Sequence, residues 1–289
     1  MSAAAALGLL LGVAGCTALE TTVCHGRDCA GRADASAGAC SSAAPDWQSC
    51  DFAWKDYGKY TVINNMWASS SGSCMWANSE RCWGSSAQYE NGDGNVKAYA
   101  SAYRGDHYGS FGTVNPTNGL PVRIADLSRL SARWNMVTPH DGRYMVLWDI
   151  YFREDAATSG DYHANLMLFQ YWFDRFGAIG GPDDVEPDPA YVGRFTVGGH
   201  EWRVKYTPSD GRVTGGPVIV GYADPIVEEA TFDLKQIIDW AVGQGWLNQD
   251  WYLSVVEVGW QLIEAGPPYG DGQFQTNDFQ VSLNDEPAL

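Results

Sequence analysis

The sequence has few charged residues, and only a minority of those are basic. Of its 289 residues 18% are charged, and 18 Lys and Arg face 35 Asp and Glu, which gives a formal net charge of −17. A surface of this charge repels the phosphates of nucleic acids and of anionic lipids. The composition therefore argues against a nucleic-acid partner and is compatible with an uncharged one, such as a neutral polysaccharide.

Several signatures of cofactor and metal chemistry are also missing. The sequence has no GxGxxG, P-loop, HExxH or GxSxG motif and no internal repeat. Its histidines are scattered, without the spacing of metal ligands. Residues 91–95, NGDGN, lack the length and the terminal Glu of an EF-hand, so they predict a turn. We therefore expect neither a cofactor nor a metal ion.

Cysteine is absent after residue 82. Apart from Cys16, the cysteines all lie in the first third of the chain: Cys24, Cys29, Cys40, Cys50, Cys74 and Cys82. An even number of cysteines in an exported chain predicts disulfides, and the one pairing that we predict is Cys50 with Cys74. Cys24 and Cys29 have the spacing of a metal-binding loop, but a second ligand pair is missing, so a disulfide or a tether is favoured.

Residues 1–16 form an apolar run that ends in small residues, which predicts an export signal. The run is too short to span a membrane as a helix. Its last four residues, VAGC, resemble a bacterial lipobox, in which Cys16 is acylated. The basic residues that usually precede such a signal are missing. Two predictions remain open. The one we favour is a lipoprotein held on the bacterial envelope, with the lipid on Cys16 as its only membrane contact; the other is a secreted protein.

A linker and one domain are predicted after the signal. Residues 17–45 are rich in Ala, Ser, Gly and Thr, a composition typical of a flexible linker. In residues 46–289, short apolar runs between Gly, Asn, Asp and Pro clusters predict β-strands. The clearest runs are residues 60–63, 144–152, 164–172, 195–197, 251–259 and 273–283.

One helix is predicted at residues 233–242. Its apolar residues Leu234, Ile237, Ile238 and Ala241 share one face by three- and four-residue spacing. Many strands and a single short helix predict an all-β fold, a jelly-roll β-sandwich of two packed sheets.

Aromatic residues are abundant, with 13 Trp and 15 Tyr. Flat rings pack against the C–H faces of sugars, so part of this excess predicts a carbohydrate-binding surface. Alternation along the strands decides which side chains share a face of the sheet. We expect an open, polar and aromatic face that suits an extended glycan, lined by Trp67, Asp149, Asn165, Phe169, Glu257 and Gln261.

Eight short motifs follow one another in order between residues 48 and 284. They are YTVINNMW at 60–67, SGSC at 71–74, GNVKAY at 94–99, WDIYF at 148–152, SGDY with NLMLF at 159–169, GAIG at 177–180, DLK with YLS at 233–235 and 252–254, and GWQLI at 259–263. No single motif is specific, but their order and spacing together resemble glycoside hydrolase family 12, the compact endoglucanases and xyloglucanases.

The resemblance implies a jelly roll of the concanavalin A-like lectin and glucanase type, with β-1,4-glucan or xyloglucan as its partner. The family hydrolyses with retention, using one Glu as nucleophile and a second as acid/base about 5 Å away. Here the nucleophile position falls on Asn165 and the acid/base position on Gln261. Asp149 matches the Asp that supports the nucleophile. Substrate contacts are implied at Asn65, Trp67, Met167 and Phe169.

Amides at these two positions leave three functions open, because Asn and Gln have no titratable proton near neutral pH and are not nucleophiles. The first, which we favour, is a glucan-binding protein without standard retaining hydrolysis. The second is an active glucanase in which Asp149 and Glu257 have taken over, as an inverting pair about 6.5–9.5 Å apart. The third is a structural envelope protein that has lost its ligand. We expect a monomer in each case.

Overall fold

The computed structural model describes residues 40, 42–66, 72–89, 95–107, 117–158, 160–173, 188–209, 215–267 and 271–289, without the side chains of residues 172 and 173. The chain divides into two units, residues 1–39 and 40–289. Cys16, the predicted signal and most of the predicted linker therefore lie outside the described residues. The second unit begins at Cys40, inside the predicted linker. No helix of the described part is long and apolar enough to cross a membrane.

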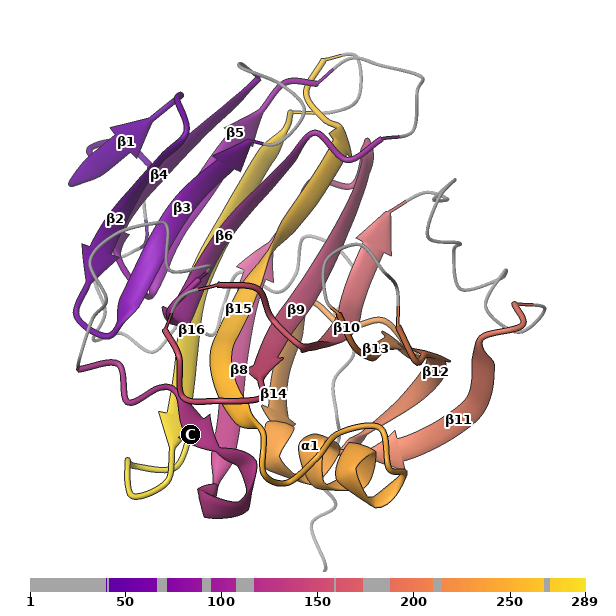
Figure 1. The fold of residues 1–289 in the computed structure, drawn as a ribbon. Coiled ribbons are helices and arrows are strands. Elements are labelled where there is room, and N and C mark those ends of the chain that lie inside the picture. The colour runs from indigo at the N-terminus through magenta and orange to yellow at the C-terminus, as the bar shows by residue number, and fades with distance from the viewer. Residues whose placement is uncertain are drawn as a thin grey trace, which may run out of the picture. The chain divides into compact units, whose positions relative to one another are not determined.

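The second unit is built from two mostly antiparallel sheets (Figure 1). The smaller sheet has six strands in the order β1-β4-β5-β16-β8-β14. Its strands are β1 (Trp47–Ser49), β4 (Ser73–Ser79), β5 (Cys82–Ala87), β8 (Leu130–Val137), β14 (Glu229–Asp233) and β16 (Gln273–Leu283).

The larger sheet has ten strands, nine of them in the order β11-β12-β13-β10-β9-β15-β6-β3-β2, with β7 paired to β15. Its strands are β2 (Ala53–Tyr57), β3 (Tyr60–Met66), β6 (Ala98–Gly105), β7 (Val122–Arg123), β9 (Arg143–Arg153), β10 (Ala164–Phe173), β11 (Tyr191–Val197), β12 (His200–Thr207), β13 (Val218–Ala223) and β15 (Tyr252–Glu264). The crossovers between the two sheets confirm the predicted jelly-roll sandwich.

β9, β10 and β15 form the middle of the larger sheet. They are rich in β-branched and aromatic residues, which fit a pleated sheet. β9 and β15 are buried on both faces, so they read as nearly continuous apolar runs. Gly259 sits inside β15 because any Cβ there would lie within 2.6 Å of the Ala100 carbonyl and the Tyr99 ring on β6.

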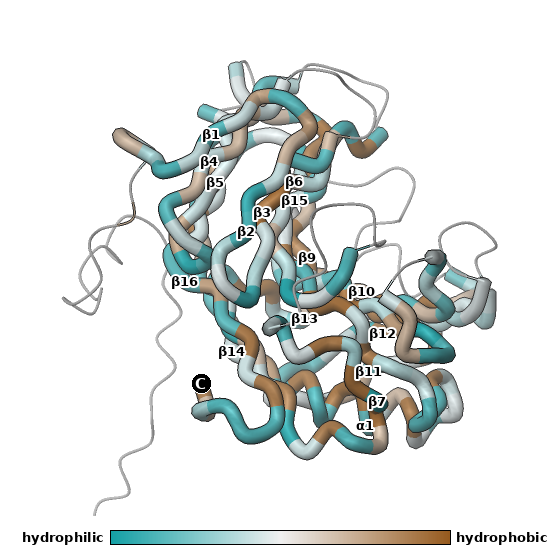
Figure 2. Tube along the Cα trace, turned by 60° about the vertical axis from the view of Figure 1, so that its left-hand side comes forward, coloured by the Kyte–Doolittle hydropathy of each residue, from teal (hydrophilic) through white to brown (hydrophobic). Residues whose placement is uncertain are grey.

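The core fills the space between the two sheets and contains large tryptophan rings. Trp83 and Trp134 on the smaller sheet contact Trp260 on the larger one, with ring centroids 4.8 and 5.6 Å apart, and Trp148 meets Trp134 at 6.1 Å. All four rings are fully buried. Figure 2 shows hydrophobic and hydrophilic residues alternating along many of the strands, as expected for side chains that point to opposite faces.

One short helix closes the end of the sandwich, beside a 3-10 turn at Ile124–Asp126. α1 spans Leu234–Gly243, one residue later than predicted, because Asp233 caps it by accepting a hydrogen bond from the backbone N–H of Gln236 at 3.0 Å. Its predicted apolar face is confirmed, since four residues of it are buried: Leu234, Ile237, Ile238 and Ala241.

Two disulfides fasten the N-terminal part of the sandwich. Cys50 pairs with Cys74, as predicted, and Cys40 pairs with Cys82. The bridges close chain segments with sequence separations of 24 and 42 residues. Limiting the unfolded chain in this way stabilises the fold by about 3–4 kcal/mol for each bridge. Cys24 and Cys29 lie outside the described residues.

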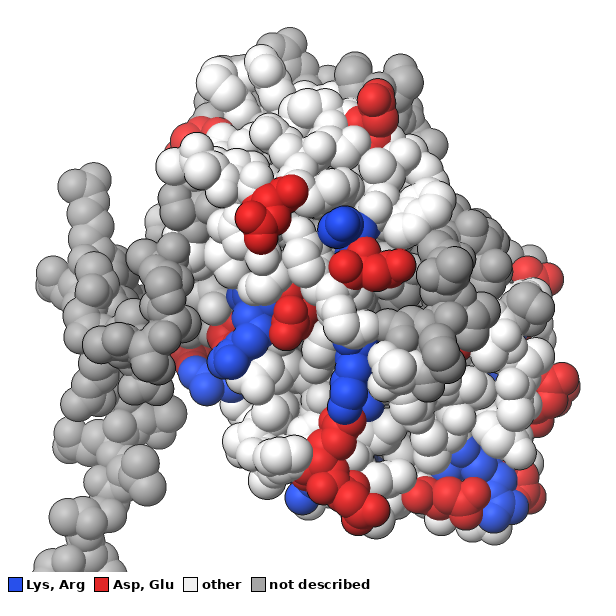
Figure 3. All heavy atoms as spheres, turned by 90° about the vertical axis from the view of Figure 1, so that its left-hand side faces the viewer, with Lys and Arg blue, Asp and Glu red and all other residues white. Residues whose placement is uncertain are grey.

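A buried arginine holds the C-terminal segment against β6. Arg104 is 1% exposed and donates two hydrogen bonds to Glu286, at 2.7 and 2.8 Å, and one to the carbonyl of Val281 at 2.8 Å. Lys59 also contacts Glu286. These partners lower the pKa of Glu286 to about 2, chiefly through the hydrogen bonds from Arg104. On the face that Figure 3 shows, most basic side chains likewise lie beside acidic ones.

We predict that Glu286→Gln destabilises the protein at neutral pH and that the difference disappears in acid. The lowered pKa means that the stability contributed by the carboxylate is present above about pH 4.5 and is lost as the pH falls toward about 2. Thermal unfolding of the variant and the parent across this range is the measurement. Asp239→Asn, which removes the exposed Lys235–Asp239 pair, is the control and should have little effect. A Glu286→Gln deficit that is constant down to about pH 2 would contradict the prediction.

Candidate functional site

The candidate site lies on the face of the larger sheet that points away from the sandwich core. We call it the site face and define it by Ser101, Asp149, Asn165, Glu257 and Gln261, which occupy β6, β9, β10 and β15. The opposite faces of the same strands carry core residues. The predicted sharing of one face by these side chains therefore follows from the observed strand pairing.

Strand register brings two carboxylates together. Glu257 on β15 lies directly opposite Asp149 on β9, and Met167 on β10 lies opposite Asp149 on the other side. Directly opposed residues of an antiparallel pair have Cβ atoms about 5 Å apart. Asn165 lies two residues before Met167 on β10, on the same face and opposite Tyr151. The structure thus assembles Asp149, Asn165 and Glu257 into one cluster.

Asp149 is held by an amide and a phenol. Asn165 Nδ2 donates to Asp149 Oδ1 at 2.5 Å, and the Tyr151 hydroxyl donates to Asp149 Oδ2 at 2.8 Å. Asn165 Nδ2 also lies 3.3 Å from the carbonyl of Ile150. The Asn165 amide, at the position where the sequence resemblance places the family nucleophile, is therefore occupied as a donor to Asp149.

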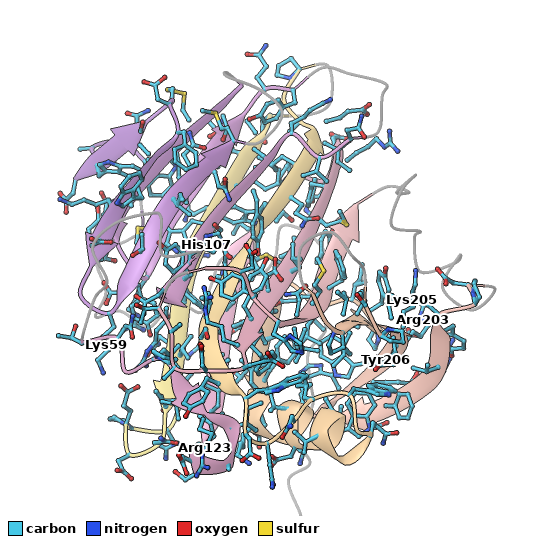
Figure 4. The ribbon with its side chains drawn as sticks, viewed as in Figure 1. Lys59, His107, Arg123, Arg203, Lys205 and Tyr206 are labelled. Carbon is cyan, nitrogen blue, oxygen red and sulfur yellow. A yellow bond between two sulfur atoms is a disulfide. The ribbon has the colours of Figure 1, made fainter. Side chains whose placement is uncertain are left out.

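Glu257 is held by a serine and a histidine. The Ser101 hydroxyl donates to Glu257 Oε1 at 2.6 Å, and His107 Nε2 lies 3.0 Å from Glu257 Oε2. Glu257 is fully buried and His107 is 4% exposed. The imidazole packs between Tyr103 and Tyr151, with ring centroids 5.2 and 6.1 Å away, and Figure 4 places it over the middle of the larger sheet.

His107 was missed by reasoning from the sequence alone, and a signal for it existed. It follows the end of β6 by two residues. Alternation from Ser101 and Tyr103, continued past Gly105, reaches His107 on the site face. Metal-ligand spacing, the pattern considered for the histidines, does not identify His107.

Burial and charge shift the proton affinities of this cluster. Burial raises the pKa of Asp149 to about 7, with the charge of Glu257 as a second cause, and the hydrogen bonds from Asn165 and Tyr151 offset only part of this. Burial lowers the pKa of His107, but the charge and hydrogen bond of Glu257 outweigh burial and raise it overall. A protonated His107 therefore compensates part of the negative charge that the two carboxylates bring into the sheet.

Gln261 lies apart from this cluster. It is four residues beyond Glu257 on β15, about 13 Å along the strand, and it faces Met145 on β9 and Tyr99 on β6. Its side chain is 4% exposed, and no described residue donates a hydrogen bond to its Oε1. Through Tyr151, Asn165 is level with Val255, which is six residues and about 20 Å along β15 from Gln261. Asn165 and Gln261 therefore do not form the pair about 5 Å apart that the resemblance implied. The structure brings Asn165 close to Asp149 and Glu257 but does not place Gln261 among them.

The predicted substrate-binding residues have different surroundings. Asn65 lies on β3 opposite Tyr99 and is 5% exposed, and Phe169 is buried with its ring stacked on Tyr222 at 5.0 Å. Met167 is half-buried beside Phe169. Trp67 lies outside the described residues. The expected openness of the face is not found at the described polar residues Asn65, Asp149, Asn165, Glu257 and Gln261, each of which is at most 5% exposed.

An accessible aromatic pair lies at the edge of the site face instead. Trp54 on the edge strand β2 pairs with Ile63 and is 37% exposed, and Phe52 beside it is 40% exposed. Their rings meet edge to face at 6.2 Å. Within the described ranges, no three His, Cys, Asp or Glu side chains gather as metal ligands.

The structure is a two-sheet jelly roll that carries Asp, Asn, Glu and Gln across one face of its larger sheet, the architecture expected from the resemblance to the glycoside hydrolases. The model of glycosyl hydrolase family 12 matches residues 58–284. The chain belongs to this family.

Individual proteins with related sequences and folds are endoglucanases and xyloglucanases by name. The chain is 21% identical over 239 residues to a probable xyloglucan-specific endo-β-1,4-glucanase A from Aspergillus clavatus, a match that covers 78% of this chain and 87% of that protein. Among solved structures, the endoglucanase cel12A from Rhodothermus marinus is 26% identical with a TM-score of 0.68, over 82% of this chain and 99% of that one. A family 12 xyloglucanase from Bacillus licheniformis shares the fold at 21% identity, with a TM-score of 0.66, over 82% of this chain and all of its own.

We predict that Asp149→Asn changes how stability depends on pH. The raised pKa means that the folded state favours the protonated acid, so the stability Asp149 contributes is complete below about pH 3.8 and is lost as the pH rises through about 7. Relative to the variant, the parent should lose up to about 4 kcal/mol of unfolding free energy across this window. Denaturant unfolding at several pH values is the measurement. A difference between the two proteins that does not vary with pH would sink the prediction.

Proposed function

We propose that this protein recognises β-1,4-glucan or xyloglucan on the site face and lacks the retaining hydrolysis of its family. The observation that carries this proposal is the Asn165 amide donating to Asp149 at 2.5 Å. An amide is not a nucleophile, and this one is already engaged as a donor. A Glu side chain in its place would put a second carboxylate against Asp149, where one of the two must stay protonated.

The class of ligand is supported by the relatives and by the charge of the chain. Matching proteins from Aspergillus carry names that specify xyloglucan, and the xyloglucanase domain of a Sinorhizobium fredii effector, a fold neighbour with a TM-score of 0.66, was solved with cellobiose. A neutral glucan fits a protein with a formal charge of −17. We further propose that the protein is exported as a monomer and held on the envelope by a lipid on Cys16, on the basis of the VAGC sequence at residues 13–16.

A second candidate, hydrolysis by Asp149 and Glu257, is favoured by two observations. The two carboxyl groups are direct cross-strand neighbours, and the pKa of Asp149 is raised to about 7, which suits a general acid near neutral pH. Directly opposed residues have Cβ atoms about 5 Å apart. This spacing suits a retaining pair better than an inverting pair, which the sequence predicted and which needs about 6.5–9.5 Å between its carboxyl groups. Against this candidate, Glu257 is fully buried, its Oε1 accepts from the Ser101 hydroxyl, and its Oε2 lies 3.0 Å from His107 Nε2.

We predict that calorimetric titration of the full chain with cello- and xyloglucan-oligosaccharides detects binding, while a reducing-end assay of the same mixtures detects no new ends. The amide at the nucleophile position is the physical reason for the absence of turnover. Asp149→Asn and Glu257→Gln serve as the discriminating variants. Turnover that either variant abolishes would replace the proposal with the second candidate. Absence of binding to every glucan would leave the structural envelope protein as the remaining function.

A further inference from the structure

We infer that Gln261 is the residue of the site face that recognises the ligand, with its side-chain carbonyl oxygen accepting a hydrogen bond from a hydroxyl group of an uncharged glycan. This inference rests on the proposed function and adds to it which of the two amides makes the contact. The sequence resemblance assigned this position to the acid/base Glu of the family.

The side-chain oxygen of Gln261 is buried without a hydrogen-bond partner among the described residues. Gln261 is 4% exposed, and within the described part of the chain its Oε1 accepts no hydrogen bond. A buried polar group left without a partner costs about 1–3 kcal/mol, and most buried polar groups in folded proteins are paired. An apolar residue of similar size would avoid this cost. The unpaired oxygen therefore points to a partner that arrives from outside the chain.

The Asn165 amide, in contrast to that of Gln261, has its partners within the protein. The Asn165 amide is committed to Asp149 and to the carbonyl of Ile150. The two amides, which the sequence resemblance assigned to the two Glu positions of the family, have different environments. Asn165 completes an internal network, whereas Gln261 retains an unused acceptor.

The neighbours of Gln261 on the site face are uncharged. Its cross-strand neighbours are Met145 and Tyr99, and Ile263 follows on the same face, so the carboxylates of the buried cluster are not adjacent in register. The row continues through Tyr99 to Asn65 on β3, a second amide on the same face that is 5% exposed. At about 4.8 Å between strands, the backbones of Asn65 and Gln261 are about 10 Å apart. This row offers neutral polar groups on an apolar floor.

The Gln261 oxygen also restricts the chemistry of the ligand. Asp149 and Glu257 lie on the same face, about 13 Å along the strands from Gln261. His107 compensates part of the charge of these carboxylates, so the chemistry of the Gln261 oxygen itself decides the ligand. A sugar hydroxyl can donate to this oxygen, whereas a carboxylate accepts hydrogen bonds only and cannot. The unpaired oxygen therefore suits the hydroxyl groups of an uncharged glycan.

The test compares Gln261→Met with the parent in two measurements. Calorimetric titration with xyloglucan- and cello-oligosaccharides should show affinity weakened about five- to tenfold, the effect of losing one hydrogen bond. Thermal unfolding without ligand should show that the variant is at least as stable as the parent, because a buried unpaired oxygen has been removed. A purely structural Gln261 would give the reverse: lower stability and unchanged affinity.

Matched variants separate the possible outcomes. Gln275→Met makes the same substitution on the smaller sheet and should leave affinity unchanged. Gln261→Ala also removes the acceptor and should weaken affinity at least about fivefold, so unchanged affinity there would overturn the assignment even if Gln261→Met fails to fold. Equal affinity of parent and Gln261→Met would refute this inference alone. A parent that binds no glucan would refute the proposed function and this inference together.

Discussion

The pairing of β15 with β9 places Glu257 opposite Asp149, and much of the site face is arranged around this contact. Two carboxylates at cross-strand distance, both buried, repel each other strongly. The chain meets that constraint with His107 and Ser101 on Glu257, and with Tyr151 and Asn165 on Asp149. In this arrangement an amide at position 165 is favourable because it donates to a carboxylate. A carboxyl group in the same place would be a third acidic group in the cluster, and it or Asp149 would have to stay protonated.

The fold could be predicted from the sequence because its signals are local. Alternation and turn residues identify the strands, and the spacing from Leu234 to Ala241 identifies the helix together with its buried face. The pairing of Cys50 with Cys74 was predicted correctly, but that of Cys40 with Cys82 was not predicted. The second bridge depends on how β5 pairs within the smaller sheet, which no local pattern reports.

The site was only partly predictable, and strand register explains why. Alternation assigned Asp149, Asn165, Glu257 and Gln261 to the correct face, because a side chain's face depends on its own strand alone. How far apart they lie depends on which residues of neighbouring strands are opposed. That register joins Asn165 to Asp149 and separates Gln261 from both. The burial of the polar side chains depends on packing over the whole face, which a single sequence does not reveal.

The disulfide from Cys40 to Cys82 has a mechanical consequence. Cys40 is the first described residue of the second unit, and its partner is the first residue of β5, next to β16 inside the smaller sheet. A pull on the chain from its N-terminal side therefore enters the sandwich at β5 through a covalent bond. The edge strand β1 and its neighbour β4 lie within the segment that the bridge closes, so tension passes them by. Tension applied at Cys40 therefore does not peel the edge strand β1 from the smaller sheet.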